Sequence, residues 1–248
     1  ACHRHVHPHR HRAYHVRVLD IWSLAEKRPH PAAPLITWIS ATDGARIELS
    51  TTTALNHMAK IANACGDELD IETDTRVFVD ISWHWQLPMW LGGLWAAGAH
   101  VVTKPDDADV LITDEDRALV VQTSVPTFAV SLHPFGLDIA APLPPGCVDA
   151  TQMVRTQPDA LMFPQDHSGA AALDNLTQHN LISAAQQLAQ DRSIPQHARI
   201  LATAASLDPL QRFLVALPIP LSSQGSLVMC ERAVEQIMES EHVTYTWN

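Results

Sequence analysis

Stretches of helical periodicity and short apolar runs follow each other along this chain. The clearest helix is predicted over Thr53–Cys65, where apolar residues recur every three or four positions. Ser50 stands in front of it with a hydroxyl that can cap the first turn, and Gly66 follows as a terminating residue. The segment therefore carries start and stop signals as well as an apolar face for packing.

The remaining elements are predicted by the same patterns. Further helices are expected over residues 19–27, 85–97, 180–190, 210–217 and 233–239. Strands are expected over residues 35–39 and 45–49, which form a hairpin, and over 76–81, 101–102, 110–112, 118–122, 127–131, 160–163, 200–203, 227–229 and 243–246. Their β-branched runs fit sheets that are covered on both faces. The alternation predicts an α/β fold with two linked doubly wound, mainly parallel sheets covered by helices.

Three parts are predicted along the chain. Residues 1–17 form a His- and Arg-rich leader, residues 18–145 a first α/β subdomain, and residues 146–248 a second one. The proline-rich stretch Pro134–Pro145 is the expected linker between the two subdomains.

The leader carries histidines at alternate positions, beginning with His3, His5 and His7. On an extended chain these imidazoles share one face, and imidazole is a ligand for zinc, copper and nickel. A disordered extension without a metal explains the same composition. We therefore keep the three histidines as candidate metal ligands but base no function on them.

The chain has a formal net charge of −11, and the part outside the leader is more acidic still. Setting aside the leader's four arginines, which no acid accompanies, leaves −15 for residues 18–248. This charge argues against nucleic acid and anionic membrane as general partners. The longest apolar run, Leu87–Val102, is interrupted by proline and glycine and is short for a membrane span. No secretory signal is visible and the cysteines form no CxxC pair, so we expect reduced thiols and a cytoplasmic location.

The segment Ala160–Leu181, ALMFPQDHSGAAALDNLTQHNL, is the most informative one for function. It resembles the signature of AMP-forming acyl-CoA synthetases and their adenylating relatives. That signature is an apolar strand, Thr-Ser-Gly-Thr-Thr-Gly-x-Pro-Lys-Gly, a short strand, and Thr-His-x-Asn-Leu at a helix entry. Here Gly169 keeps one glycine, while Thr177 and Asn180 match the helix entry. The resemblance implies the synthetase fold and a loop derived from a phosphate-binding one.

The same loop lacks groups that hold a phosphate. Ala172 stands at the lysine position, and Asp166 and Leu173 stand at glycine positions. Glycines let backbone N–H groups converge on phosphate oxygens, whereas a carboxylate repels them. We therefore expect no cofactor, and specifically no ATP, AMP or CoA. A loop without any ligand is one reading; if the loop binds a smaller or neutral ligand, the candidate residues are Gln165, His167, Ser168, Gly169 and Thr177.

The resemblance covers most of Leu19–Asn248. The phrases SLHPFGLDIAAPLPPG and RIELS are similar to a short actinobacterial family related to the synthetases. Only Thr103–Ala108 separates two strands that a longer crossover joins in the synthetases. Their adenine-binding, metal-binding and C-terminal catalytic segments have no counterpart in this sequence. Adenylation needs a cation on the developing charge and a closing lid, and neither is identified here.

Three functions are consistent with these features. The first, which we favour, is a non-catalytic relative of the synthetases that binds a small molecule or a protein partner. Its ligand would lie in the crevice at the carboxyl ends of the strands. The second is residual adenylate-forming or acyl-transfer chemistry completed by a partner chain. The third is a structural subunit that docks through apolar surface. No catalytic residue is assigned.

Two further clusters have alternative interpretations. The acidic residues between Asp106 and Asp116 could bind a divalent cation, but their spacing favours a solvated acidic rim. Four tryptophans gather around His84 and either pack in the core or line an acyl pocket. They are Trp83, Trp85, Trp90 and Trp95.

Overall fold

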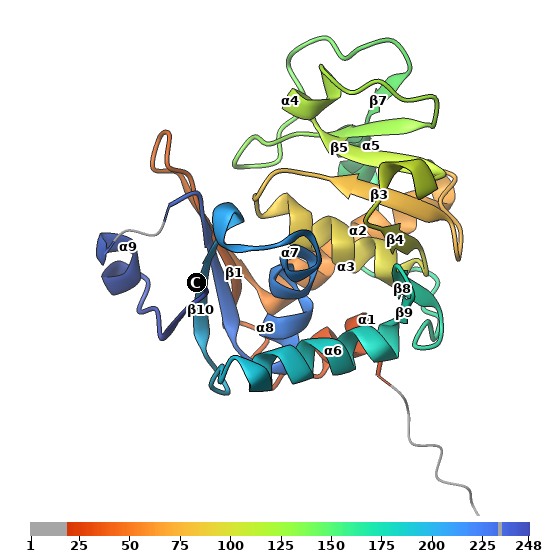
Figure 1. Ribbon diagram of the computed structural model, residues 1–248. Helices are drawn as coiled ribbons and strands as arrows, with labels where there is room; N and C mark the ends of the chain where they lie inside the picture. Colours follow the sequence, from red (N-terminus) through yellow and green to blue (C-terminus); the bar gives the residue numbers. More distant parts are fainter. Residues whose placement is uncertain (1–18, 233–234) are drawn as a thin grey trace, which may run out of the picture.

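The computed structural model describes residues 19–232 and 235–248. Its chain forms two β-sheets with helices packed between them, and α9 lies on the outer side of the first sheet (Figure 1). The predicted α/β fold with two mainly parallel, helix-covered sheets is confirmed. The leader with His3, His5 and His7 lies outside the described residues.

The elements follow each other in the alternation that the sequence predicts. The helices are α1 (Ile21–Glu26), α2 (Thr51–Asp67), α3 (Gln86–Ala96), η1 (Pro105–Asp107), α4 (Glu115–Ala118), α5 (Ala150–Thr156), α6 (Gln178–Asp191), η2 (Ala204–Ser206), α7 (Pro209–Ala216), α8 (Pro218–Ser222) and α9 (Glu235–Ser240). The strands are β1 (Pro34–Ile39), β2 (Arg46–Ser50), β3 (Arg76–Asp80), β4 (His100–Val102), β5 (Val110–Asp114), β6 (Thr127–Val130), β7 (Cys147–Asp149), β8 (Ala171–Leu173), β9 (Leu176–Thr177), β10 (Arg199–Thr203), β11 (Ser226–Cys230) and β12 (Tyr245–Thr246).

The described residues form one sheet of five strands and one of seven. Sheet A has the order β12-β10-β11-β1-β2, and sheet B has the order β7-β6-β5-β3-β4-β8-β9. The β1–β2 and β8–β9 hairpins are antiparallel, and the other neighbouring strands are parallel. Parallel strands joined through helices are the expected outcome of the alternating pattern.

Each sheet takes strands from both sides of the boundary expected between residues 145 and 146. In sheet A, β1 pairs with β11, so that Ile36 lies opposite Leu227. In sheet B, β7 forms one edge while β8 and β9 form the other. The sheets therefore do not coincide with the two halves of the chain, and the division into two subdomains stays a prediction.

Helix α3 lies in the interior between the sheets and is buried along its whole length. A helix that is apolar all round is expected to be buried on every side. It approaches α2 closely at Gly93, where an added Cβ would lie 2.5 Å from Ile61. On another side, the indole Nε1 of Trp95 donates to the carbonyl of Ala172 in β8 at 2.8 Å. Helix α3 thus joins the helical layer to β8, which lies next to the edge strand β9 of sheet B.

The local signals for helix starts are confirmed. The Ser50 hydroxyl accepts a hydrogen bond from the Thr53 amide at 3.1 Å and caps α2. The Thr177 hydroxyl accepts from the Asn180 amide at 3.2 Å and caps α6 in the same way. Both contacts satisfy an amide that would otherwise have no partner within the first turn.

Two predicted strands are wrong. Residues 160–163 are irregular because the Asn63 side chain on α2 bonds this segment directly, donating to the carbonyl of Ala160 and accepting from the amide of Met162. Residues 118–122 are the end of the short helix α4 and the turn after it, where the amides of Val120 and Val121 donate to the carbonyl of Arg117. In both places the backbone is bonded by groups other than a neighbouring strand.

The crossover between β4 and β5 contains only the short helix η1. This agrees with the short connection expected from residues 103–108. In the two stretches that the structure describes, the helices are all too short or too polar to cross a bilayer.

Candidate functional site

Residues 164–170 form the loop that the sequence singled out, and it leads into the β8–β9 hairpin and α6. His167 of this loop packs against Gly98, which lies just before β4. The loop therefore lies at the amino ends of the strands of sheet B. Ligands of open α/β sheets usually bind at the carboxyl ends. The loop therefore lies at the opposite ends of the strands from the crevice in which a ligand was expected.

The five candidate ligand-binding residues do not face one common space. Gln165 and His167 line a cavity of about 440 Å³. The amide of Ser168 donates to the Asp166 carboxylate at 2.9 Å. Gly169 borders open space, since no atom lies within 4 Å of the place of an added Cβ. Thr177 serves as the cap of α6.

The backbone amides at the start of α6 are already bonded within the chain. The amide of Gln178 donates to the carbonyl of Ala170 at 3.1 Å, and the amide of His179 donates to the carbonyl of Ser168 at 3.0 Å. The next amide, of Asn180, bonds to Thr177. A helix start binds phosphate through amides that have no other partner. Here the loop folds back onto α6 and uses those amides itself.

The cavity beside the loop is acidic. Asp67 and Glu72 line it, and its lining within the described residues includes neither lysine nor arginine. Ala172, which stands at the lysine position of the resemblance, is fully buried in β8. Because like charges repel, a phosphate group in this cavity would be disfavoured. The charges of the cavity wall therefore favour a neutral ligand over a nucleotide.

Replacing Gly98 with alanine should disturb the loop. Gly98 has a φ of +81°, and an added Cβ would lie 2.6 Å from the Cε1 and Nδ1 atoms of His167. We expect Gly98→Ala to lower the free energy of unfolding by about 2 kcal/mol, from left-handed strain and overpacking together. Urea unfolding measures the loss, and the imidazole NMR signals of His167 report its displacement.

Gly169→Ala is the matched control for this prediction, because it lies in the same loop with open space around it. It should change stability by less than about 1 kcal/mol. Equal losses in the two variants would contradict the packing of His167 against Gly98.

Charged residues at the carboxyl ends of β3 and β5 are paired with each other. The buried Asp114 accepts from the amide and the hydroxyl of Ser82, both at 2.7 Å, and from the amide of Arg117 at 3.0 Å. Arg117 also forms an ion pair with Asp80. The interpretation as a solvated acidic rim is therefore wrong for Asp114. Among the described residues, no group of three side chains is arranged to hold a metal ion.

The loop between β3 and α3 contacts both sheets. The Trp83 indole donates to the carbonyl of Ala202 in β10 at 3.0 Å. His84 is 3% exposed and lies edge-on to Trp38 of β1, with ring centroids 4.3 Å apart. Its buried Nε2 has no hydrogen-bond partner, and burial lowers the pKa of His84 to about 3. The imidazole is therefore neutral at pH 7.

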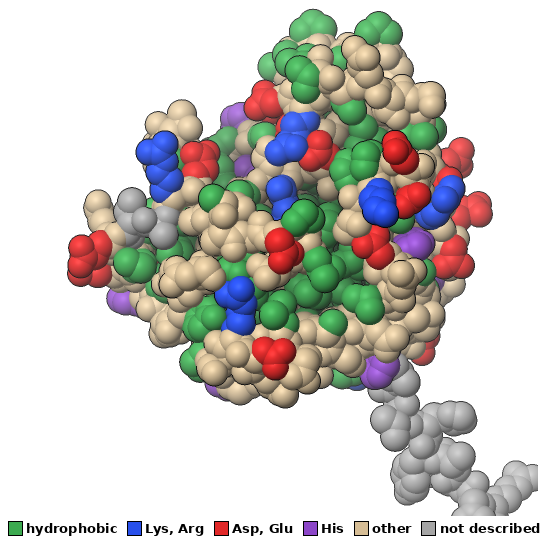
Figure 2. Space-filling view, in the orientation of Figure 1, with side chains coloured by type: hydrophobic (Ala, Val, Ile, Leu, Met, Phe, Trp, Pro, Cys, Tyr) green, Lys and Arg blue, Asp and Glu red, His purple; other side chains and the backbone are tan. Residues whose placement is uncertain are grey.

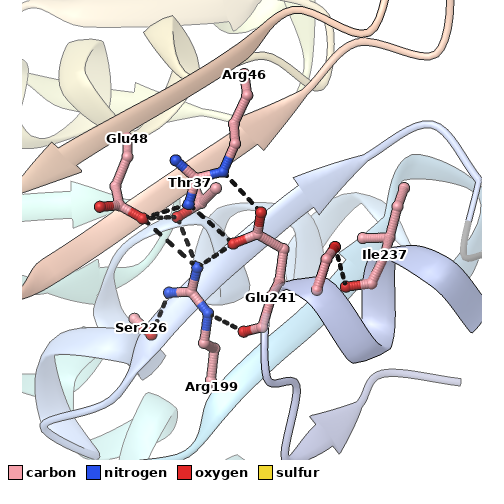
Figure 3. A network of polar contacts seen from close by, with 8 residues as sticks. Thr37, Arg46, Glu48, Arg199, Ser226, Ile237 and Glu241 are labelled. Atoms are coloured by element: carbon pink, nitrogen blue, oxygen red, sulfur yellow. Dashed lines mark hydrogen bonds and ion pairs between the residues drawn. The ribbon is translucent and has the colours of Figure 1, made fainter.

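A cavity of about 680 Å³ borders an ion-pair network on sheet A (Figure 3). Arg46 Nε lies 2.7 Å from Glu241 Oε1, and Arg199 Nη2 lies 2.5 Å from Glu241 Oε2. Arg46 also reaches Glu48 at 2.6 Å. The bond from Arg46, and then that from Arg199, holds the pKa of Glu241 below its usual value. These arginines are neutralised by the network, which connects β2, β10 and the segment after α9.

A small cavity of about 150 Å³ lies near the carboxyl end of β6. The rings of Trp85 and Trp90 line it, so these two tryptophans are core residues that also face a cavity. The polar part of its wall comes from His57, Lys60, Gln86, Thr151 and Arg155. Gln86 and His57 could not be selected from the sequence, because neither belongs to a recognisable motif.

No protein-family model matches the chain. It is 32% identical over 210 residues to a protein of Mycobacterium tuberculosis described as a TIGR03089 family protein, and the match covers 81% of this chain and 84% of that protein.

Solved structures with the same fold are enzymes of the acyl-CoA synthetase type. An acyl-CoA synthetase from Brucella canis has a TM-score of 0.72 and 15% identity, covering 92% of this chain and 47% of that one. A long-chain-fatty-acid-CoA ligase from Archaeoglobus fulgidus has a TM-score of 0.68 and 12% identity, covering 92% and 50%. An anthranilate CoA ligase in complex with anthranoyl-AMP has a TM-score of 0.66 and 14% identity, covering 88% and 46%. The chain thus spans about half the length of these structures, and at these identities the likeness establishes the fold.

Proposed function

Because the chain belongs to the TIGR03089 family and has the fold of AMP-forming acyl-CoA synthetases, we propose that it is a non-catalytic relative of these enzymes that binds a small molecule. The observation that carries the proposal is that the loop before α6 bonds to the first backbone amides of this helix. The loop's own carbonyls occupy the amides of Gln178 and His179, where an anion would otherwise bind.

The charges around the loop support the same proposal. The carboxylates of Asp67 and Glu72 line the neighbouring cavity, and the buried Ala172 supplies no cation. Catalysis of adenylation depends on donors and cations aimed at the developing negative charge. The setting that we propose is the cytoplasm, which the free thiols of Cys65, Cys147 and Cys230 support.

A nucleotide-binding experiment tests this function. The melting temperature of the full chain should stay unchanged with ATP, AMP, CoA or a non-hydrolysable acyl-AMP mimic, because a ligand that prefers the native state must stabilise it. Pyrophosphate exchange with a panel of carboxylic acids should remain at background. An acyl-CoA synthetase assayed in parallel controls for the reagents. Robust exchange, or a saturable shift with ATP, would favour residual adenylate chemistry instead.

A protein partner is the second candidate, and exposed apolar side chains favour it. Figure 2 shows hydrophobic side chains at the end of the molecule that carries α4 and β7. Val120 is 80% exposed in this region, and Phe163 is 74% exposed beside the acidic cavity. Exposed apolar groups of this kind are common at docking surfaces. Co-purification of a stoichiometric second chain with the full protein would support a binding or structural subunit.

A further inference from the structure

The cavity of about 150 Å³ is enclosed by α2, α3, α5 and the turn after β6. Ile61, Trp85, Trp90 and Val130 form its apolar walls. Phe135 lies at its mouth with 78% of its surface exposed, and Gly136 forms the adjoining turn. The Trp85 indole donates to the carbonyl of Pro134 at 3.1 Å and ties this turn to the wall. The space is therefore a built pocket with an opening beside an exposed ring.

Gln86 brings a side-chain amide to the wall of the pocket. Gln86 is 7% exposed and lines the cavity, and its side chain makes no hydrogen bond within the described residues. Its Nε2 lies beside Gly136, 3.6 Å from the place of an added Cβ. The amide atoms of Gln86 are not among the fully buried polar atoms without a partner in the described residues, so the amide reaches the pocket space. An amide donor and an acceptor are thus presented to whatever enters.

His57 adds a second polar group on the same wall. Its ring contacts Trp85 edge-to-face, with centroids 5.2 Å apart, and it makes no hydrogen bond within the described residues. Burial, and then the nearby charge of Lys60, lowers the pKa of His57. The imidazole is therefore neutral at pH 7, with one donor and one acceptor nitrogen.

Two cations, Lys60 and Arg155, also line the pocket, and each is paired with a carboxylate. Lys60 Nζ lies 2.9 Å from Asp159 Oδ1 and also donates to the carbonyl of Gln157. Arg155 Nη1 lies 2.8 Å from Asp138 Oδ1. An anionic ligand would have to compete with these carboxylates, so the wall favours an uncharged one.

The volume and the walls limit the ligand further. An engineered apolar cavity of about 150 Å³ accepts a benzene molecule. Aromatic walls pack well against a flat ring. We propose that this pocket binds an uncharged compound with a single aromatic ring and one amide or hydroxyl group, which bonds to Gln86 while the ring contacts Trp85 and Trp90. The proposal deepens the proposed function, since it rests on small-molecule binding and names the site and the ligand class.

Titration of the full ¹⁵N-labelled chain with benzamide, and separately with phenol, tests the pocket. The indole NMR signals of Trp85 and Trp90, assigned with single Trp→Phe variants, should shift saturably. Benzoate has the same ring with a charge, and a naphthalene carboxamide has the same amide on a larger ring. Both should bind at least about fivefold more weakly, a difference of roughly 1 kcal/mol.

Gln86→Met is the decisive variant, since methionine has a similar shape without the amide. It should weaken benzamide binding at least about fivefold, as expected for one lost hydrogen bond. Gln187→Met, on the exposed face of α6, is the matched control and should bind as the unchanged protein does. Val154→Phe, which adds a ring at the cavity wall, should abolish binding while the circular dichroism spectrum stays native.

Absence of saturable shifts at Trp85 and Trp90, or equal binding by Gln86→Met and Gln187→Met, would overturn the pocket assignment. The proposed function would survive that result if another small molecule stabilised the protein and shifted signals elsewhere. Pyrophosphate exchange would instead overturn the proposed function, whether or not benzamide bound. The two failures are therefore distinguishable.

Discussion

Replacing Ala172 with lysine should lower the free energy of unfolding by about 3–5 kcal/mol, because the new side chain enters the core. Ala172 is fully buried in β8, and its carbonyl holds the indole of Trp95. A lysine must either bury its ammonium group there or push β8 away from α3. Urea unfolding followed by circular dichroism measures the loss.

Ala171→Lys is the matched control, because the side chain of Ala171 lies on the other, half-exposed face of the same strand. It should cost less than about 1 kcal/mol. The Ala172→Lys variant should also gain no affinity for ATP, since the amides before α6 remain occupied by the loop. A stable Ala172→Lys protein that binds ATP would contradict both the burial of this position and the proposed function.

Acidification from pH 7 to pH 5 should cost about 2 kcal/mol of stability through His84 alone. Burial lowers its pKa in the folded chain to about 3, whereas an unfolded histidine titrates near its ordinary value of 6.5. Between these values the unfolded chain binds a proton that the folded chain does not, so stability falls as the pH falls. Each pH unit below 6.5 costs about 1.4 kcal/mol until the folded pKa is reached.

His84→Gln should remove this dependence, and His179→Gln, on the exposed start of α6, should keep it. The free energy of unfolding of each variant is measured at pH 7 and at pH 5. The change in this free energy from pH 7 to pH 5 is then compared between the two variants. Comparing these changes cancels any direct effect of the substitution on packing. Identical pH dependence in the two variants would contradict the burial of a neutral imidazole beside Trp38.

Local signals allowed much of the fold to be predicted from the sequence. Ser50 caps α2 as expected, and Thr177 lies at the start of α6 as the resemblance implied, since helix starts depend on residues three positions apart. The hairpin of β1 and β2 was equally local. The pairing of β1 with β11 was not predictable, because it depends on residues at distant points of the chain. The clamp of Asn63 on residues 160–162 is non-local in the same way.

The candidate site was predicted only in part. The sequence identified the loop, but its surroundings come from other segments, such as Asp67 at the end of α2 and Glu72 before β3. The place of Gln86 on a cavity wall could not be recognised from a pattern, because the cavity forms only where α2, α3 and α5 pack together. The residues of the loop that stand as ligand candidates remain predictions.

The pairing of β1 with β11 has a consequence for the synthesis of the chain on the ribosome. Residue Ile36 is translated long before its partner Leu227. The strands of sheet B are all translated before β10 and β11, which form the centre of sheet A. During that interval the nascent β1–β2 hairpin has an edge without its native neighbour. Such an edge is prone to wrong pairing, so we expect it to need shielding until β11 has been translated.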